Sequence, residues 1–184
     1  MKHWLFIVAL ALTFNVSAQR EKAKEYFDRG YSLNGQGNYR GAIETLLQAV
    51  ALDSTGDCGT GIGGNAQGEI GYAYLRSGDT INAYKYLDKS IVLNPSNPLP
   101  RQNKAVLLSM QKKYDDAVKT LDELIQLRPE FIDAYVQRGF FYNTQNKKQL
   151  AIDDFKKALE LNKKSNALPS NLVKTLNDMI NSQK

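Results

Sequence analysis

The sequence predicts an all-α fold built from four stacked helix pairs and one final helix. A small residue is followed twelve positions later by alanine in four places: Gly30 and Ala42, Gly71 and Ala83, Ala105 and Ala117, Gly139 and Ala151. These repeats begin 41, 34 and 34 residues apart. Apolar residues within each half of a repeat follow helical spacing, as in residues 114–127. A helix pair this short must stack on its neighbours to bury its apolar face.

Each repeat contains two helical segments separated by a polar or glycine-containing break. The breaks fall at residues 34–38, 77–79, 111–113 and 145–147, and they suit tight turns between antiparallel helices. The small residue in the first helix and the alanine in the second let the two backbones approach closely where they cross. We therefore expect the crossing of each pair to lie at these positions.

This pattern resembles the tetratricopeptide repeat, a helix-turn-helix unit of about 34 residues. The residues that carry the resemblance are the small residue at the eighth position, the alanine at the twentieth, and four residues later Leu46, Leu87, Leu121 and Phe155. The matching units are 23–56, 64–97, 98–131 and 132–165, within a repeat domain that spans 19–184. The chain departs from the family at its usual tryptophan position, which holds Tyr26, Gln67, Arg101 and Tyr135. The resemblance implies a right-handed α-solenoid.

Two segments fall outside the repeat register. Residues 57–63 form a glycine-rich insert, which we expect to be a flexible loop; its Cys58 could be buried, exposed or paired with another chain. Residues 59–64 satisfy G-x-G-x-x-G, but no strand precedes them as a dinucleotide site requires. Residues 170–182, with Ser170 as candidate N-cap, predict a helix that caps the last pair.

Composition excludes most catalytic chemistry. The 184 residues include one cysteine and one histidine, and the histidine is His3 in the predicted signal segment. A mature chain without histidine has no Ser-His-Asp or Cys-His triad and no HExxH metal helix. The acidic pairs Asp115–Asp116 and Asp153–Asp154 lie in the first two turns of second helices, where negative charge complements the helix dipole. We expect a protein that is not an enzyme, with no cofactor and no metal.

Residues 1–18 predict a secretory signal peptide. A basic start at Lys2 precedes an apolar stretch at 4–14, and small residues lead to a cut between Ala18 and Gln19. Eleven apolar residues span roughly 16 Å, about half of a bilayer's hydrocarbon core, so we expect cleavage rather than an uncleaved anchor. The mature chain is expected to have no transmembrane segment and to be exported, either periplasmic or secreted.

The family resemblance also implies a concave groove lined by the first helix of each unit. The candidate groove residues are aromatic, amide or basic: Phe27, Tyr31, Asn34, Tyr72, Arg76, Asn103, Phe140 and Asn143. Aromatic faces and amides suit an extended peptide or a partner helix. For Tyr72 and Phe140, packing against the neighbouring helix pair is an equal alternative.

The expected function is a non-catalytic protein–protein interaction scaffold in the cell envelope. The alternative is a structural or self-assembling envelope component that stacks through its solenoid ends. Some family members grip a C-terminal carboxylate with a Lys, Asn, Asn, Lys, Arg set, but only Asn103 matches it here. The C-terminal lysines alternate with acidic residues, which indicates a solvated outer face rather than a nucleic-acid site.

Overall fold

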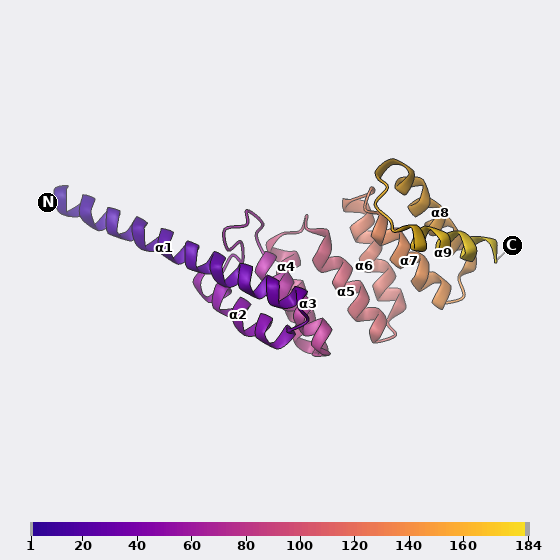
Figure 1. Cartoon of the computed structure of the whole chain (residues 1–184), viewed down its shortest axis with the longest axis horizontal. Helices are drawn as coiled ribbons and strands as arrows, with labels where there is room; N and C mark the ends of the chain where they lie inside the picture. The colour runs from indigo at the N-terminus through magenta and orange to yellow at the C-terminus, as the bar shows by residue number, and fades with distance from the viewer. Residues whose placement is uncertain (1, 183–184) are drawn as a thin grey trace. The chain divides into compact units, whose positions relative to one another are not determined.

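The computed structural model describes residues 2–182, and the side chains of residues 16–182. Within these residues the secondary structure consists of nine helices without a strand, which confirms the all-α prediction (Figure 1). The chain divides into two compact units, Met1–Pro100 and Arg101–Lys184. Each unit is described separately below.

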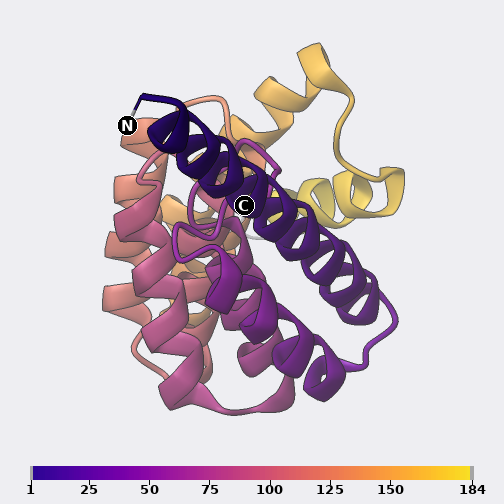
Figure 2. The ribbon, with the colours of Figure 1, turned by 90° about the vertical axis from the view of Figure 1, so that its left-hand side faces the viewer.

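The first unit contains two helix pairs. Its helices are α1 (Lys2–Gly35), α2 (Tyr39–Leu52), α3 (Asn65–Ser77), α4 (Thr80–Leu93) and the first residues of α5 (Pro98–Met110). Helix α1 packs on α2, and α2 packs in turn on α3, which packs on α4. Figure 2 shows α1 and α2 side by side, joined by a short turn.

The second unit holds the rest of α5 and the remaining helices. These are α6 (Tyr114–Leu127), α7 (Ile132–Thr144), α8 (Lys148–Ser165) and α9 (Ser170–Asn181). Helix α7 packs on α6 and on α8, and α9 packs on α8.

Side chains in the turns explain where two of the second helices begin. The Asn38 side chain accepts a hydrogen bond from the Gly41 backbone N–H at 3.1 Å, and this caps α2. The Asp79 side chain accepts one from the Asn82 N–H at 3.0 Å, and this caps α4. Such caps satisfy N–H groups that have no partner within the helix. Gly78, which ends α3, has a φ of +87° that side chains seldom tolerate.

The helix pairs cross at the predicted small residues. A Cβ placed on Gly30 would lie 2.5 Å from Cγ of Leu46, and one on Gly139 would lie 2.5 Å from Cε1 of Phe155. The alanines of the second helices have no exposed surface; they are Ala42, Ala83, Ala117 and Ala151. The close approach of the two backbones is therefore confirmed for the pairs that contain Gly30 and Gly139.

Helix α9 covers the apolar surface of the last helix pair, as predicted. Leu176 and Ile180 of α9 are buried in one cluster with Tyr135 of α7 and Phe155 of α8. The predicted N-cap, however, is displaced by one residue. Ser170 is the first residue of the helix, and the N-cap is Pro169, which makes no side-chain cap hydrogen bond.

The insert at 57–63 is a loop whose backbone is bonded to two aspartate side chains, and its flexibility stays a prediction. The side chain of Asp53 accepts a hydrogen bond from the Cys58 N–H at 2.9 Å, and that of Asp57 accepts one from the Ile62 N–H at 3.0 Å. Cys58 itself is fully buried in the core of the first unit. Its burial raises the pKa of the thiol to about 11, with smaller contributions from the two neighbouring aspartates. The thiol is therefore protonated at neutral pH.

The predicted signal peptide falls largely outside the described side chains, because residue 1 is not described and residues 2–15 are described by their backbone alone. Cleavage between Ala18 and Gln19 stays a prediction. Among the residues that the structure describes, none of the helices has the length and apolar character needed to cross a bilayer.

Candidate functional site

Two of the predicted groove residues form a cluster with a third residue in the first unit. Arg76 near the end of α3 is exposed, and its guanidinium carbon lies 5.9 Å from the ring centroid of Tyr72 and 5.6 Å from that of Tyr39. The two rings meet edge to face, with centroids 6.2 Å apart. Both contacts are within cation–π range. We call Tyr39, Tyr72 and Arg76 the arginine–tyrosine cluster.

Asn34 is buried and joins α1 to α3. Its Nδ2 donates hydrogen bonds to the backbone oxygen of Glu69 at 3.1 Å and to Oε2 of Glu69 at 2.8 Å. Burial raises the pKa of Glu69, and the hydrogen bond from Asn34 offsets part of that rise. Asn34 is only 5% exposed. Its role is therefore to fix the two first helices against each other rather than to present a free amide.

Phe27 and Tyr31 have opposite environments although they are one helical turn apart. Phe27 is buried in the core of the first unit, whereas Tyr31 is 59% exposed. The two rings are stacked, with centroids 6.1 Å apart and an interplanar angle of 22°. The buried ring thus supports the exposed one, and Tyr31 is the member of this stacked pair that a partner can reach.

The three predicted residues of the second unit are all partly buried. Asn103 lies on α5, and Phe140 and Asn143 lie on α7. The Phe140 ring meets Phe155 of α8 edge to face, with centroids 5.2 Å apart, and it packs against the core cluster of that unit. For Phe140 the packing role is therefore observed, so that this residue is a weaker candidate for partner contact than Tyr31.

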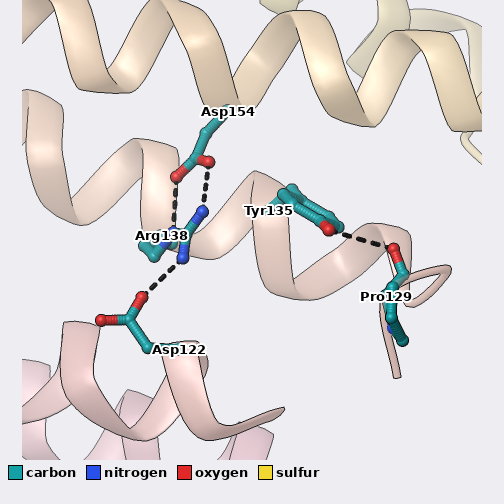
Figure 3. A network of polar contacts seen from close by, with 5 residues as sticks. All are labelled: Asp122, Pro129, Tyr135, Arg138 and Asp154. Carbon is teal, nitrogen blue, oxygen red and sulfur yellow. Dashed lines mark hydrogen bonds and ion pairs between the residues drawn. The ribbon is translucent and has the colours of Figure 1, made fainter. Parts of the chain in front are cut away.

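An ion-pair network in the second unit was not predicted. Arg138 of α7 donates from Nε and Nη2 to the two carboxylate oxygens of Asp154 of α8, at 2.8 and 2.6 Å (Figure 3). Its Nη1 donates to Oδ1 of Asp122 of α6 at 2.5 Å. These hydrogen bonds raise the pKa of Arg138, although burial opposes them. The Tyr135 ring lies 5.6 Å from the guanidinium carbon, and its hydroxyl donates to the Pro129 carbonyl oxygen at 3.0 Å.

The network assigns different roles to the two members of one acidic pair. Asp153 is exposed and accepts a hydrogen bond from Gln149, whereas the Asp154 side chain is 8% exposed and paired with Arg138. The position of Asp154 in the second turn of α8 agrees with the sequence analysis, but its pairing with Arg138 was not predicted. Because Arg138 bridges α6 to α8, we interpret the network as structural. Among the side chains that the structure describes, no group of three or more His, Cys, Asp or Glu residues is arranged to hold a metal ion.

The helix pairs, with their crossings at small residues and their capped end, define this chain as an α-helical repeat protein. One model of the tetratricopeptide repeat matches residues 65–97 and 132–165, and a second matches residues 86–119. The chain belongs to the tetratricopeptide repeat family. Two of these matches coincide within one residue with the predicted units 64–97 and 132–165.

Comparison with known proteins supports the same fold. Human DnaJ homolog subfamily C member 3 is 30% identical over 122 residues, which is 66% of this chain and 24% of that protein. The chain thus spans about a quarter of the length of the first curated relatives it matches. The crystal structure of MamA aligns with a TM-score of 0.69 at 24% identity, covering 85% of this chain and 87% of that one.

A further neighbour contains a bound peptide. The first TPR of Spaghetti (RPAP3) bound to an HSP90 peptide aligns with a TM-score of 0.57 at 22% identity. The alignment covers 65% of this chain and 92% of that chain. At this level of identity, the likeness shows the all-α tetratricopeptide repeat solenoid fold and nothing more specific.

Proposed function

We propose that this chain is a non-catalytic scaffold that binds an extended segment of a partner protein along the first helices of its repeats. The observation that carries the proposal is the exposed Tyr31 on α1, together with the exposed Arg76 of the arginine–tyrosine cluster on α3. Membership of the tetratricopeptide repeat family supports it, as does the peptide in the related Spaghetti structure. No cofactor or metal is needed for this function.

The chemistry of this surface suits a peptide. A tyrosine ring offers a large contact area and loses little conformational freedom on binding, since it has only two side-chain torsions. The Phe27 ring stacked beneath Tyr31 restricts it further. The hydrogen bonds of Asn34 to Glu69 hold α1 and α3 in a fixed relation before any partner arrives. Such preorganisation lowers the entropy that binding must overcome.

The first experiment captures the partner by crosslinking from native cells and then measures its affinity for purified variants. Tyr31→Ala should weaken binding about tenfold to a hundredfold, or about 1–3 kcal/mol, if this exposed ring is an anchor. Tyr84→Ala provides a matched control, because Tyr84 is a partly exposed tyrosine on a second helix. Lys156→Ala on α8 provides a second control on an outer face.

The outcome is read only from variants whose thermal melts match the wild type. Full affinity of Tyr31→Ala together with a loss in Tyr84→Ala or Lys156→Ala would place the binding on the second helices and refute the groove proposal. Phe140→Ala is less suitable as a test, because loss of its contact with Phe155 alters the core.

Self-assembly through the solenoid ends is the alternative function. It has less support, because α9 buries Leu176 and Ile180 against the last helix pair and thereby removes apolar surface from that end. Sedimentation velocity over a range of protein concentrations separates the two proposals. Growth in size with concentration favours assembly, and a concentration-independent monomer favours the scaffold.

We further propose that the scaffold acts outside the cytoplasm, in the periplasm or after secretion. The proposal rests on the basic start, the short apolar stretch at 4–14 and the small residues before Gln19. Intact-mass measurement of the protein purified from its native source should give a chain that begins at Gln19. A mass that includes residues 1–18 would contradict cleavage.

A further inference from the structure

Arg76 differs in its partners from three other arginines of the chain. Arg40 pairs with Glu44, Arg128 with Glu130, and Arg138 with Asp122 and Asp154. Among the described side chains, Arg76 has no carboxylate partner, and its recorded contacts are the rings of Tyr39 and Tyr72. Its charge is therefore exposed and not neutralised by an ion pair.

The two tyrosine rings restrict the position of this charge. One ring comes from the start of α2 and the other from α3, and their edge-to-face contact fixes them against each other. A guanidinium held by two aromatic faces loses less conformational entropy when it binds an anion than a free arginine does. The planar guanidinium can still donate two parallel hydrogen bonds to one carboxylate.

The nearest acidic residue on the same face of α3 does not neutralise Arg76. Glu69 lies seven residues earlier, or roughly 10 Å along the helix axis, and its carboxylate accepts the hydrogen bond from Asn34. Tyr72 lies between the two residues in sequence and presents its ring beside the guanidinium. The surface near the end of α3 therefore combines an apolar ring with an uncompensated positive charge.

We propose that the arginine–tyrosine cluster binds an aspartate or glutamate side chain within an extended, acidic partner segment. This inference rests on the proposed scaffold function and adds the chemistry of the partner. The carboxylate would pair with the Arg76 guanidinium, and the neighbouring methylene groups would pack on Tyr72. A side chain is favoured over a terminal carboxylate, because only Asn103 matches the residue set with which family members grip a chain end.

The test uses a random library of ten-residue peptides displayed at the N-terminus of a phage coat protein. Peptides displayed in this way have no free C-terminal carboxylate, so any acidic preference comes from side chains. The wild-type chain should select peptides enriched in Asp and Glu, and Arg76→Gln should lose that enrichment. Arg40→Gln serves as the matched control, since Arg40 is an exposed arginine on α2 that already has Glu44 as its partner.

A selected peptide is then synthesised with an amidated C-terminus and titrated against the same variants. Arg76→Gln should weaken binding about tenfold, which is the usual loss for a charge-assisted pair. Replacing the peptide's acidic residue by its amide should cost the wild type a similar factor and should cost Arg76→Gln much less. This non-additivity identifies a direct contact.

The possible failures are distinguishable. Selection without acidic enrichment, or full affinity of folded Arg76→Gln while Tyr31→Ala loses binding, would overturn the inference and leave the scaffold proposal standing. Binding seen only with peptides that carry a free C-terminus would assign the site to a terminal carboxylate and overturn the inference too. If no peptide were enriched above a phage control, both proposals would be contradicted.

Discussion

Replacing Asp154 by alanine removes one of the two carboxylates that pair with Arg138 in the second unit. The Asp154 side chain is 8% exposed and accepts two hydrogen bonds from Arg138, whose own side chain is 18% exposed. Removing one partner of a buried ion pair costs about 3–5 kcal/mol, because the remaining charge stays buried. Arg138 keeps its hydrogen bond to Asp122, whose side chain is 42% exposed, so we expect a smaller loss of about 2–3 kcal/mol.

Urea denaturation followed by far-UV circular dichroism measures this loss as a change in the free energy of unfolding. Asp153→Ala is the matched control, because Asp153 is the adjacent residue, is exposed and accepts a hydrogen bond from Gln149 alone. Asp153→Ala should change the free energy of unfolding by no more than about 0.5 kcal/mol. Equal unfolding midpoints for Asp154→Ala and Asp153→Ala would refute the reasoning. The double replacement Arg138→Met with Asp154→Leu should recover much of the stability, because no buried charge is left without a partner.

Three other predictions concern the helix crossings, the half-buried carboxylate of Glu69 and the buried thiol of Cys58. Gly139→Ala should lower the free energy of unfolding by about 1–3 kcal/mol, because the added Cβ would lie 2.5 Å from the Phe155 ring. Gly35→Ala is the control: its Cβ would have no atom within 4 Å, so the loss should be less than about 0.5 kcal/mol. Equal losses would contradict the position of the helix crossing. Burial raises the pKa of Glu69 above its usual 4.5, so the contribution of this carboxyl to stability is complete below pH 4.5 and falls as pH rises through the folded-state pKa. The stability of Glu69→Gln relative to the wild type should therefore increase from pH 4 to pH 7. Parallel pH profiles of the two proteins in chemical denaturation would contradict this prediction. The pKa of Cys58 is raised from 9.0 to about 11, which lowers the fraction of reactive thiolate at pH 8. Cys58 should therefore react with iodoacetamide at pH 8 about a hundredfold more slowly in the folded chain than in urea. Comparable rates in the two conditions would show that the loop is open.

The repeat register was predictable because it depends on local chemistry. Helical spacing of apolar residues, glycine-containing breaks and the small residues at the crossings recur at fixed intervals, and the structure places helix boundaries and crossings accordingly. Gly139 is an example of such a small residue, because a Cβ at this position would lie only 2.5 Å from the Phe155 ring. The capping helix was predictable for the same reason, from the spacing of its apolar residues.

The ion-pair network left a weak signal in the sequence that was not recognised. Asp122 and Asp154 each lie sixteen residues from Arg138, one before it and one after it. Equal spacing on both sides is what a residue on a middle helix needs to reach its two neighbours. Charged residues are frequent on helix surfaces, however, and the sequence alone did not distinguish the buried Asp154 from the exposed Asp153.

The sequence by itself determined the all-α repeat, the positions of the helices and the set of residues on the first-helix face, since these follow from periodicity within single helices. Only the tertiary structure decided which of those residues are accessible. Phe27 and Tyr31 are both aromatic and lie one helical turn apart, but packing of α2 and α3 covers the Phe27 ring and leaves Tyr31 59% exposed. Likewise, Tyr39 meets Arg76 only because the start of α2 lies beside the end of α3. Exposure and ion pairing depend on contacts between helices distant in sequence, which the spacing within one helix does not specify.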